Sequence, residues 1–176
     1  MPVEHQIHPG RSSSGPIDEA AIARLLADHA RLRYVCEELG NLADRLADCP
    51  SLHERCAAAN LLNTTMREHV KATSRFFSQA FEGEVLDYED GILARILTRQ
   101  ITDCIDAEDM SEALQAPELD LVGASTLADM LRRVLESCRR ALDFEELSLL
   151  SVGAERLTAA ARTSLQQLLA QPQEAG

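Results

Sequence analysis

The strongest constraint on the fold is a series of apolar residues that recur at alternating steps of three and four positions. In the first long segment the series is Ile22, Leu25, His29, Leu32, Cys36, Leu39, Ala43 and Leu46. Such spacing keeps these side chains on one face of an α-helix, which then packs against the rest of the protein. His29 interrupts the series, and a buried polar group costs free energy unless it is hydrogen-bonded or binds something. The segment therefore predicts a helix with one polar position in its buried face.

Three further segments continue the same spacing, and each places polar residues in its inward stripe. The interrupting residues are His69 and Thr73 in the second stripe, Gln100 and Cys104 in the third, and Glu145 in the fourth. The complete fourth stripe is Leu127, Leu131, Val134, Cys138, Ala141, Glu145 and Leu149. Polar positions in all four buried faces indicate a shared site, or the remains of one.

Turn and capping residues divide the chain into helices. Predicted helices cover about 17–48 and 51–81, a third opens at 87–90, a fourth opens at Ser125, and a short fifth covers about 158–171. Ser51 and Glu54 have the spacing of a capping box at the start of the second helix. The acidic stretch 106–112 either extends the third helix or forms a separate turn, and 117–123 is the clearest loop. We expect a flexible tail at 1–16 and one bundle domain at 17–172.

Length and composition favour a single all-α domain. The chain has 176 residues, aromatic residues make up only 3% of them, and there is no Trp. A β-sandwich or barrel would need more β-branched and aromatic side chains, whereas this length suffices to bury a helical core. Consecutive helices joined by short connections pack antiparallel. The predicted fold is therefore an up-down-up-down four-helix bundle with a short C-terminal fifth helix.

The helix lengths place the polar positions at one depth in such a bundle. His29 lies 19 residues before Asp48, at the end of the first helix, and His69 lies 18 residues after Ser51. At about 1.5 Å per residue, the two imidazoles therefore lie at nearly the same height. Gln100 matches His69 across the next turn in the same way, whereas the long connection before the fourth helix leaves the height of Glu145 open.

Charge and cysteine content narrow the choice of compartment and partner. The 29 acidic and 17 basic residues give a net charge of −12, which repels nucleic acid and anionic membranes but suits a basic protein partner. No apolar run reaches the length of a transmembrane helix, and the first residues lack a signal-peptide pattern. The five cysteines include no C-x-x-C pair, which is typical of reduced thiols. We expect a cytoplasmic protein whose partner, if it has one, is another protein.

The segments around the polar positions resemble the hemerythrin-like, or HHE cation-binding, family. Residues 25–32, LLADHARL, are similar to the opening segment of that family, and the resemblance assigns its metal-binding histidine to His29. Residues 69–77, HVKATSRFF, are similar to its second motif, H-x-x-x-E before an apolar pair, with Thr73 in place of the carboxylate. The resemblance covers most of residues 20–170 and implies an up-down-up-down bundle around a di-iron centre bound by histidines and carboxylates.

The third and fourth motifs depart further from the family pattern. The third should carry H-x-x-x-H or H-x-x-x-E, but Gln100 and Cys104 stand at these positions. The fourth should also read H-x-x-x-E, and here Ala141 replaces the histidine while Glu145 keeps the carboxylate. The positions that have lost a usual ligand are thus Thr73, Gln100 and Ala141. An oxygen-binding di-iron centre is therefore disfavoured, because an alanine cannot bind a metal and neutral amide or hydroxyl groups are poor ligands for iron.

Three interpretations of the polar residues on the four inward stripes remain open. The first, which we favour, is an eroded centre without a cofactor, in which the polar side chains hydrogen-bond one another and the protein has a non-enzymatic binding, sensing or protein-interaction role. In the second, one zinc or iron ion in a sensor is bound by His29, His69, Cys104 and Glu145. The third is the di-iron, oxygen- or iron-binding protein that the family resemblance alone implies.

Two other features allow further interpretations. Cys36 and Cys138 fall on inward stripes, where they serve as small apolar fillers or, alternatively, as a redox-sensing thiol pair. The segment from His69 through Ser74 has a superficial similarity to the histidine segment of a phosphotransfer bundle, with its Lys displaced. A phosphate-carrying histidine must be exposed, however, and His69 lies on the inward stripe.

Overall fold

The structure is a computed structural model that describes residues 16–81 and 91–170. Its helices are α1 (Glu19–Arg45), α2 (Leu52–Ala80), α3 (Ile92–Leu114), α4 (Leu121–Val152) and α5 (Ala159–Leu169), with a 3-10 turn, η1 (Leu46–Asp48), after α1. No strand occurs in this described part of the chain. The prediction of an all-α fold is confirmed.

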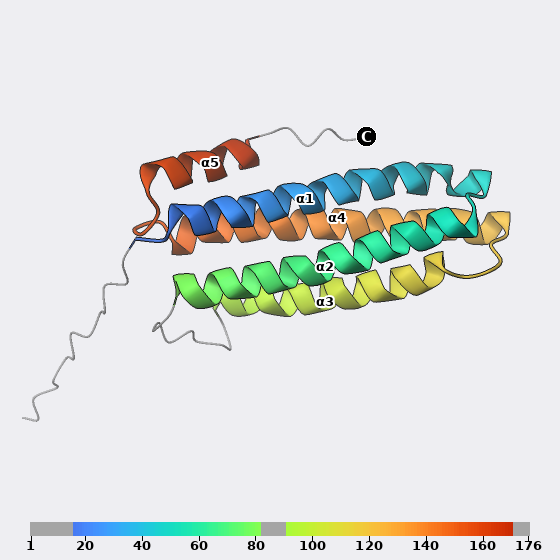
Figure 1. The fold of residues 1–176 in the computed structure, drawn as a ribbon, viewed down its shortest axis with the longest axis horizontal. Helices are drawn as coiled ribbons and strands as arrows, with labels where there is room; N and C mark the ends of the chain where they lie inside the picture. Colours follow the sequence, from blue (N-terminus) through green and yellow to red (C-terminus); the bar gives the residue numbers. More distant parts are fainter. Residues whose placement is uncertain (1–15, 82–90, 171–176) are drawn as a thin grey trace, which may run out of the picture.

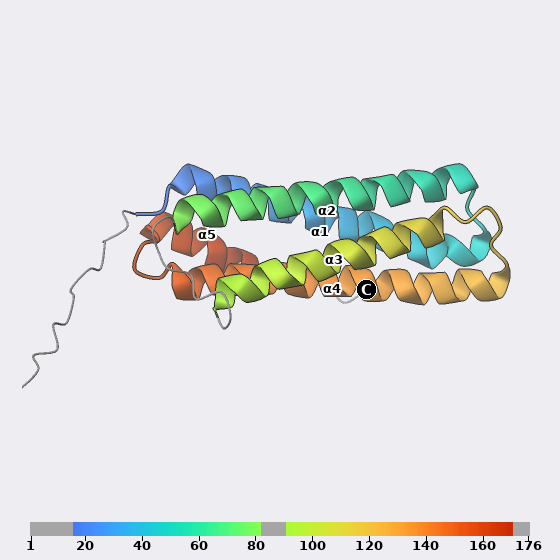
Figure 2. The ribbon, with the colours of Figure 1, turned by 90° about the horizontal axis from the view of Figure 1, so that it is seen from below.

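The four long helices form a bundle in which successive helices alternate in direction (Figures 1 and 2). α1 packs against α2 and α4, and α3 packs against the same two helices. α5 folds back along the outside of the bundle, where it contacts α1 and α4. The backbone amide of Ile17 donates to the carbonyl of Arg156 (3.0 Å), which ties the start of α1 to the turn before α5. The expected bundle with a short C-terminal helix is therefore present.

The turn between α1 and α2 forms as the sequence predicts. Cys49 adopts a φ of 53°, in the left-handed region, and ends η1. The capping box at the start of α2 is complete: the Glu54 amide donates to Ser51 Oγ (3.3 Å), and the Ser51 amide donates to the Glu54 carboxylate (2.9 Å). This turn sets the relative height of α1 and α2, and with it the height of their histidines.

The connection between α3 and α4 is shorter than expected. α3 continues through the acidic stretch to Leu114, so this stretch belongs to the helix. α4 begins at Leu121, earlier than the predicted start at Ser125, because the Asp120 side chain accepts a hydrogen bond from the Gly123 amide (2.6 Å). Two predictions lie outside the described residues: the acidic opening of the third helix at 87–90, and the tail at 1–16 except for Pro16.

The core of the bundle consists of two hydrophobic clusters with polar side chains between them. The cluster toward η1 includes Leu32, Leu39, Leu62, Leu131 and Leu142. The cluster toward α5 includes Ile22, Leu25, Phe77, Ile96 and Leu149. On each long helix the two clusters are separated by buried polar residues, namely His29, His69, Thr73, Gln100 and Glu145, which we call the polar layer. The predicted polar level shared by four helices is therefore present.

The buried face of α4 differs from the predicted stripe at two positions. Leu135 and Leu142 are buried, whereas Val134 and Ala141 are only half-buried. Both sets satisfy steps of three and four, so spacing alone does not distinguish them. Packing of α4 against both α1 and α3 selects the observed face.

Candidate metal centre

Two histidines and a glutamate from three helices meet in the polar layer. The exposed fraction is 0% for His29 of α1, 3% for His69 of α2 and 2% for Glu145 of α4. His29 Nε2 lies 3.3 Å from Glu145 Oε2, and His69 Nε2 lies 3.5 Å from Glu145 Oε1. The ring centroids are 5.4 Å apart, in an edge-to-face arrangement. Both rings therefore turn the same nitrogen, Nε2, toward one carboxylate.

A second carboxylate binds the other nitrogen of each ring. His29 Nδ1 lies 2.8 Å from Glu146 Oε1, and His69 Nδ1 lies 2.7 Å from Asp28 Oδ2. An ionised carboxylate only accepts, so Nδ1 of each imidazole is the donor. Each accepting residue comes from a helix next to that of its histidine, since Glu146 is on α4 and Asp28 on α1. In a neutral ring, Nε2 then carries the lone pair that faces Glu145.

Arg33 of α1 supports Glu146 from the outer side of the bundle. Its guanidinium donates to Glu146 Oε1 (2.8 Å) and Oε2 (3.0 Å), and also to Asp143 Oδ1 (2.9 Å). The side chain of Glu146 is fully buried, whereas 25% of the Arg33 side chain is exposed. Both oxygens of Glu146 are therefore engaged, which fixes the carboxylate that orients His29.

α3 contributes an amide to the layer. Gln100 Nε2 donates to Glu145 Oε1 (2.8 Å). Four buried atoms of the layer have no hydrogen-bond partner among the described residues, namely Gln100 Oε1, Thr73 Oγ1, His29 Nε2 and Glu145 Oε2. Buried polar atoms are normally paired. These atoms therefore have free capacity for an ion or a water molecule.

The carboxylates change the protonation of both imidazoles. Burial disfavours the charged ring, but hydrogen bonds to Asp28 and Glu145 outweigh it and raise the pKa of His69 to about 9. The pKa of His29 is likewise raised, against the same effect of burial, by Glu145 and Glu146. Burial disfavours an ionised carboxyl group, yet the two imidazoles lower the pKa of Glu145 to about 2. A metal-free layer therefore favours imidazolium rings around an ionised Glu145.

The same arrangement of His29, His69 and Glu145 suits a metal ion, which would take the place of the protons on the Nε2 atoms of the two rings. The ligand atoms of His29, His69 and Glu145 all lie within 4.8 Å of one another. Two ligands at about 2.0–2.2 Å from a tetrahedral ion are about 3.3–3.6 Å apart, and the Nε2 atom of each ring lies at such a distance from one of the two oxygens of Glu145. A histidine that binds a metal through one nitrogen usually donates its other N–H to a carboxylate or carbonyl. The three residues, with Glu146 and Asp28 behind them, therefore have the arrangement of a mononuclear site.

The structure does not bring every expected ligand to this group. Cys104 is half-buried beside the cluster toward η1, and it is not part of the group of ligand atoms that lie within reach of one ion. Burial, Glu108 and Asp103 raise the pKa of its thiol. Ala141 is half-buried and offers no ligand atom. The four-ligand set expected from the sequence thus reduces to three in the described part of the chain.

The residues that orient the imidazoles are not among those expected from the sequence. Asp28 directly precedes His29, Glu146 directly follows Glu145, and Arg33 lies one turn after His29. A residue next to an inward ligand lies on the flank of the helical face, from where it reaches a neighbouring helix. A charged residue beside each inward ligand is therefore a usable signal, although the stripe pattern assigns such residues to solvent.

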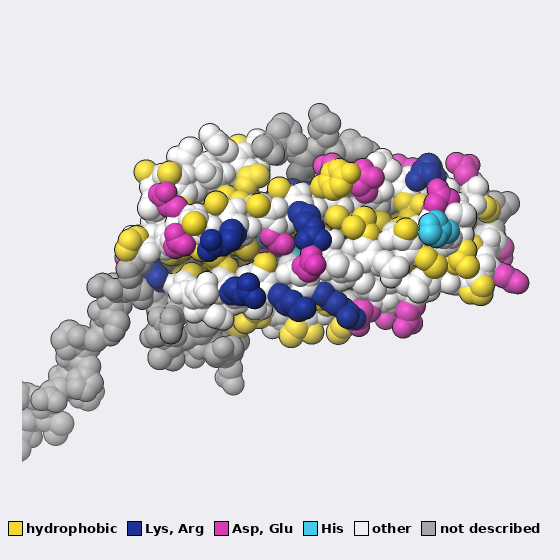
Figure 3. Space-filling model, viewed as in Figure 1, with side chains coloured by type: hydrophobic (Ala, Val, Ile, Leu, Met, Phe, Trp, Pro, Cys, Tyr) yellow, Lys and Arg dark blue, Asp and Glu magenta, His cyan; other side chains and the backbone are white. Residues whose placement is uncertain are grey.

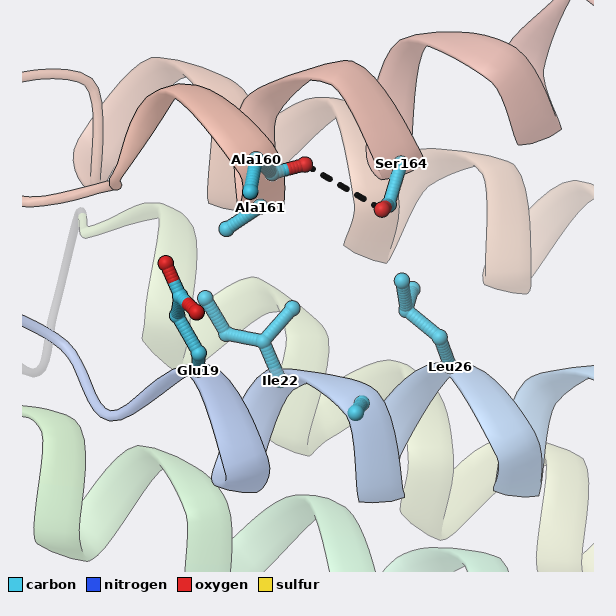
Figure 4. A pocket seen from close by; sticks show the side chains of 7 residues that line it. Glu19, Ile22, Leu26, Ala160, Ala161 and Ser164 are labelled. Carbon is cyan, nitrogen blue, oxygen red and sulfur yellow. Dashed lines mark hydrogen bonds between the residues drawn. The ribbon is translucent and has the colours of Figure 1, made fainter.

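A hollow on the surface lies apart from these ligands. It has a volume of about 200 Å³ and is situated between α1 and α5, where Ile22 and Leu26 point toward α5 (Figure 4). Most of its lining is apolar, and its polar residues are Glu19 and Ser164. The Ser164 hydroxyl already donates to the carbonyl of Ala160 (3.1 Å). The hollow therefore offers little polar recognition and contains none of the three ligand residues.

The outer surface carries charges of both signs. On the face shown in Figure 3, basic and acidic side chains lie among each other over α1 and α2. Arg31 of α1 pairs with Glu68 of α2, and Arg67 of α2 pairs with Glu108 of α3 (2.8 Å). None of the helices in the described residues is long and apolar enough to cross a membrane.

Comparisons with known proteins give no match. No protein-family model matches the chain, and neither a curated protein nor a solved structure matches it. The resemblance to the hemerythrin-like family therefore rests on the sequence motifs around His29, His69 and Glu145, and it stays a prediction.

Proposed function

We propose that the protein binds one divalent transition-metal ion, zinc or ferrous iron, through His29, His69 and Glu145, and that it is a binding or sensing protein rather than an enzyme. The observation that carries this proposal is the orientation of the two imidazoles. Each ring turns Nε2 toward Glu145 while its Nδ1 is bound by a different carboxylate. Two rings oriented in this way direct the lone pairs of their Nε2 atoms toward the same point that the Glu145 carboxylate faces.

The donor set narrows the choice of ion. Two imidazoles and one carboxylate are ligands that both zinc and ferrous iron accept, with further positions left open. Calcium and magnesium prefer six or more oxygen ligands, which this layer does not supply. The neutral residues at Thr73, Gln100 and Ala141 support one ion rather than two.

The burial of the ligands supports binding over catalysis. Their exposed fractions do not exceed 3%, and the hollow between α1 and α5 contains none of them. A substrate molecule would have to separate the helices, whereas a single ion needs only a brief movement of side chains. Because the ligands belong to α1, α2 and α4, a bound ion would link three helices and stabilise the folded bundle. Bundle stability would then depend on metal supply, which is what a sensor requires.

We further propose a reducing compartment, the cytoplasm, and a protein partner that recognises the metal-bound bundle. Five free cysteines support the compartment. A net charge of −12 supports a protein partner over nucleic acid or an anionic membrane. The resemblance of the sequence to the hemerythrin-like family agrees with a metal-related role.

Elemental analysis of untagged protein, purified without chelator, tests the proposal. We expect about one equivalent of zinc or iron in the purified chain, since three ligands suffice for one ion. His29→Gln and His69→Gln should each lose the ion, because each removes one ligand atom. His53→Gln is the matched control, since His53 is exposed at the start of α2 and should keep the metal. Full metal content in both site variants would contradict the proposal, and two equivalents of iron would favour a di-iron centre.

The eroded centre is the second candidate, and the raised pKa values of both imidazoles favour it. Protonated His29 and His69 can pair with the surrounding carboxylates without any ion. In that case neither zinc nor ferrous iron should raise the melting temperature of the purified protein. A metal site instead predicts a rise in melting temperature that His69→Gln abolishes.

A further inference from the structure

The helices that carry the three proposed ligands also carry three sulfur atoms at a neighbouring level. Cys36 lies seven residues after the site histidine of α1, Cys138 lies seven before the glutamate of α4, and Met66 lies three before the histidine of α2. Steps of three and seven stay on one helical face. Because α1 runs opposite to α2 and α4, all three residues lie on the η1 side of the polar layer (Figure 1). We call Cys36, Met66 and Cys138 the sulfur layer.

The side chains of the sulfur layer contact one another. Cys138 Sγ lies 3.9 Å from Met66 Sδ, and the thiols of Cys36 and Cys138 are close enough that each shifts the pKa of the other. Their exposed fractions are 0% for Cys36 and 2% for each of the other two, and all three belong to the hydrophobic cluster toward η1. α1 and α4 are fixed side by side at this level, because the Arg139 guanidinium donates to the carbonyl of Cys36 (3.3 Å). The sulfur atoms are thus held together by packing on all sides.

The spacing and the chemistry of this group fit a soft metal ion. Two sulfur ligands at about 2.3 Å from one ion lie about 3.8–4.0 Å apart, whether the geometry is tetrahedral or trigonal. The distance between Cys138 and Met66 falls in that range. Thiolates bind zinc, iron–sulfur clusters and Cu(I), but a thioether is a soft ligand that zinc sites do not use, so the Met66 sulfur favours Cu(I). We propose that Cys36, Met66 and Cys138 form a Cu(I) site, separate from the centre at His29, His69 and Glu145.

The charges around the layer suit a monovalent ion. The neighbouring Cys138 thiol lowers the pKa of Cys36, and the positive charges of Arg139 and Arg33 act in the same direction against the effect of burial. The Cys36 thiol and burial raise the pKa of Cys138, so its proton leaves only when the ion binds. Two thiolates, a neutral thioether and one Cu(I) carry a net charge of −1, which the nearby positive charges of Arg139 and Arg33 offset in part. Copper stays in the Cu(I) state throughout, and each thiol that binds it releases its proton.

Anaerobic titration with Cu(I), in competition with the chelator bicinchoninate, tests the site. The titration uses a background variant in which the three other cysteines, Cys49, Cys56 and Cys104, are replaced by Ser. These thiols are exposed or half-buried, so they would bind copper independently of the proposed site. We expect about one Cu(I) per chain that resists the competitor, and X-ray absorption should show sulfur neighbours at about 2.3 Å without nitrogen or oxygen.

Substitutions in this background identify the ligands. Met66→Leu keeps the side-chain volume and removes only the sulfur, so we expect a folded protein with at least about tenfold weaker Cu(I) binding. Cys36→Ser and Cys138→Ser should abolish the tight site. His69→Gln should leave Cu(I) binding unchanged while it removes zinc or iron, which separates this proposal from the first one.

Several results would overturn the Cu(I) site. These are no tight Cu(I) in the folded background variant, unchanged affinity in Met66→Leu, or loss of Cu(I) on His69→Gln. A disulfide between Cys36 and Cys138 that forms with hydrogen peroxide, in protein that takes up no Cu(I), would also overturn it and identify the pair as redox-active. Circular dichroism of each variant shows whether a loss of binding reflects the ligand or the fold.

Discussion

The sulfur layer is built on three of the four helices that carry the polar layer, but different forces maintain the two layers. In the polar layer, each imidazole is fixed by a carboxylate at Nδ1 and faces Glu145 with Nε2, and Glu146 is fixed in turn by Arg33. In the sulfur layer, the side chains are surrounded by hydrocarbon and make only weak sulfur contacts. One layer is a network of buried charges, and the other is part of the hydrophobic core. Equivalent positions in a bundle can thus carry ligands whose removal has very different consequences.

The difference follows from the cost of an unmatched charge. Removal of one partner from a buried ion pair costs about 3–5 kcal/mol, because the other partner stays buried and charged. A volume-conserving exchange in a hydrophobic core usually costs less than about 1.5 kcal/mol. We therefore expect substitutions in the polar layer to reduce the stability of the metal-free protein far more than substitutions in the sulfur layer.

The largest effect is expected for Glu145→Leu. This change removes the carboxylate that faces both imidazoles and also the acceptor of Gln100. The metal-free protein should lose about 3–5 kcal/mol of unfolding free energy, measured by urea denaturation, because two buried rings that favour the charged form lose their shared partner. A loss of less than about 1 kcal/mol would show that the layer does not depend on this carboxylate.

A triple variant serves as the control for that prediction. His29→Leu and His69→Met combined with Glu145→Leu replace both imidazoles and their shared carboxylate by apolar side chains of similar size, while Glu146 keeps its partner Arg33. Replacing a complete buried ionic group in this way is often neutral or stabilising. We expect the triple variant to recover most of the stability lost in Glu145→Leu. Failure to recover it would indicate that packing, rather than unmatched charge, explains the loss.

The pH dependence of stability is the next largest effect. The folded-state pKa of His69, about 9, lies above its ordinary value of 6.5, so its stabilisation is complete below pH 6.5 and is lost as the pH rises through 9. Glu145 behaves in the opposite way: its pKa of about 2 gives a stabilisation that is lost as the pH falls from 4.5 toward 2. The metal-free protein should be most stable between these ranges and lose about 3 kcal/mol from pH 6.5 to pH 9.

Urea denaturation across this pH range, with His69→Gln and His53→Gln beside the wild type, measures the effect. His69→Gln should flatten the alkaline decline, because the titrating group is gone. His53→Gln should keep the decline, because His53 is exposed. An equal decline in all three proteins would assign the pH dependence to groups other than His69.

The helices and the depth of the polar layer follow from local pattern, which explains why the sequence predicts them well. The inward stripe of α1 and the capping box at Ser51 depend only on neighbours along the chain, and both form as expected. The start of α4 depends on one hydrogen bond from Gly123 to Asp120, which a residue pattern does not single out against Ser125. The choice between Ala141 and Leu142 as the buried residue depends on two neighbouring helices at once, and spacing cannot decide it.

The candidate site likewise has a part that the sequence predicts and a part that it does not predict. His29, His69 and Glu145 lie on inward stripes, so their convergence follows from helix spacing and turn length. The contacts from Asp28 to His69 and from Glu146 to His29 cross between helices, and they depend on the rotation of each helix about its axis. Cys104 shows the opposite error, because the sequence predicts it as a ligand and the structure does not bring it to the site. It shares a predicted stripe with Gln100, yet the rotation of α3 leaves it half-buried beside the core.

A smaller effect is expected for the carboxylate behind His69. Asp28→Asn keeps the shape of the side chain but removes the charge that accepts from Nδ1. Loss of such an outer partner typically lowers metal affinity about 10–100-fold, so we expect a loss in that range for zinc, measured by competition with a chromophoric chelator. Asp44→Asn, an exposed position on the same helix, is the control and should bind as the wild type does. Equal affinity in both variants would mean that Asp28 has no part in the metal site.

The smallest effect is expected in the sulfur layer, where Met66→Leu changes shape but leaves no charge or polar atom unmatched. In copper-free protein we expect a change of less than about 1.5 kcal/mol in unfolding free energy, because leucine fills a similar volume. If Met66 binds Cu(I), the difference between wild type and variant should grow when Cu(I) is added, since a ligand that binds the folded state adds its own stabilisation. Urea denaturation with and without Cu(I), under anaerobic conditions, measures both quantities on the same pair of proteins. A large loss without copper would show that the thioether serves packing, and the contrast between the two layers would then not hold.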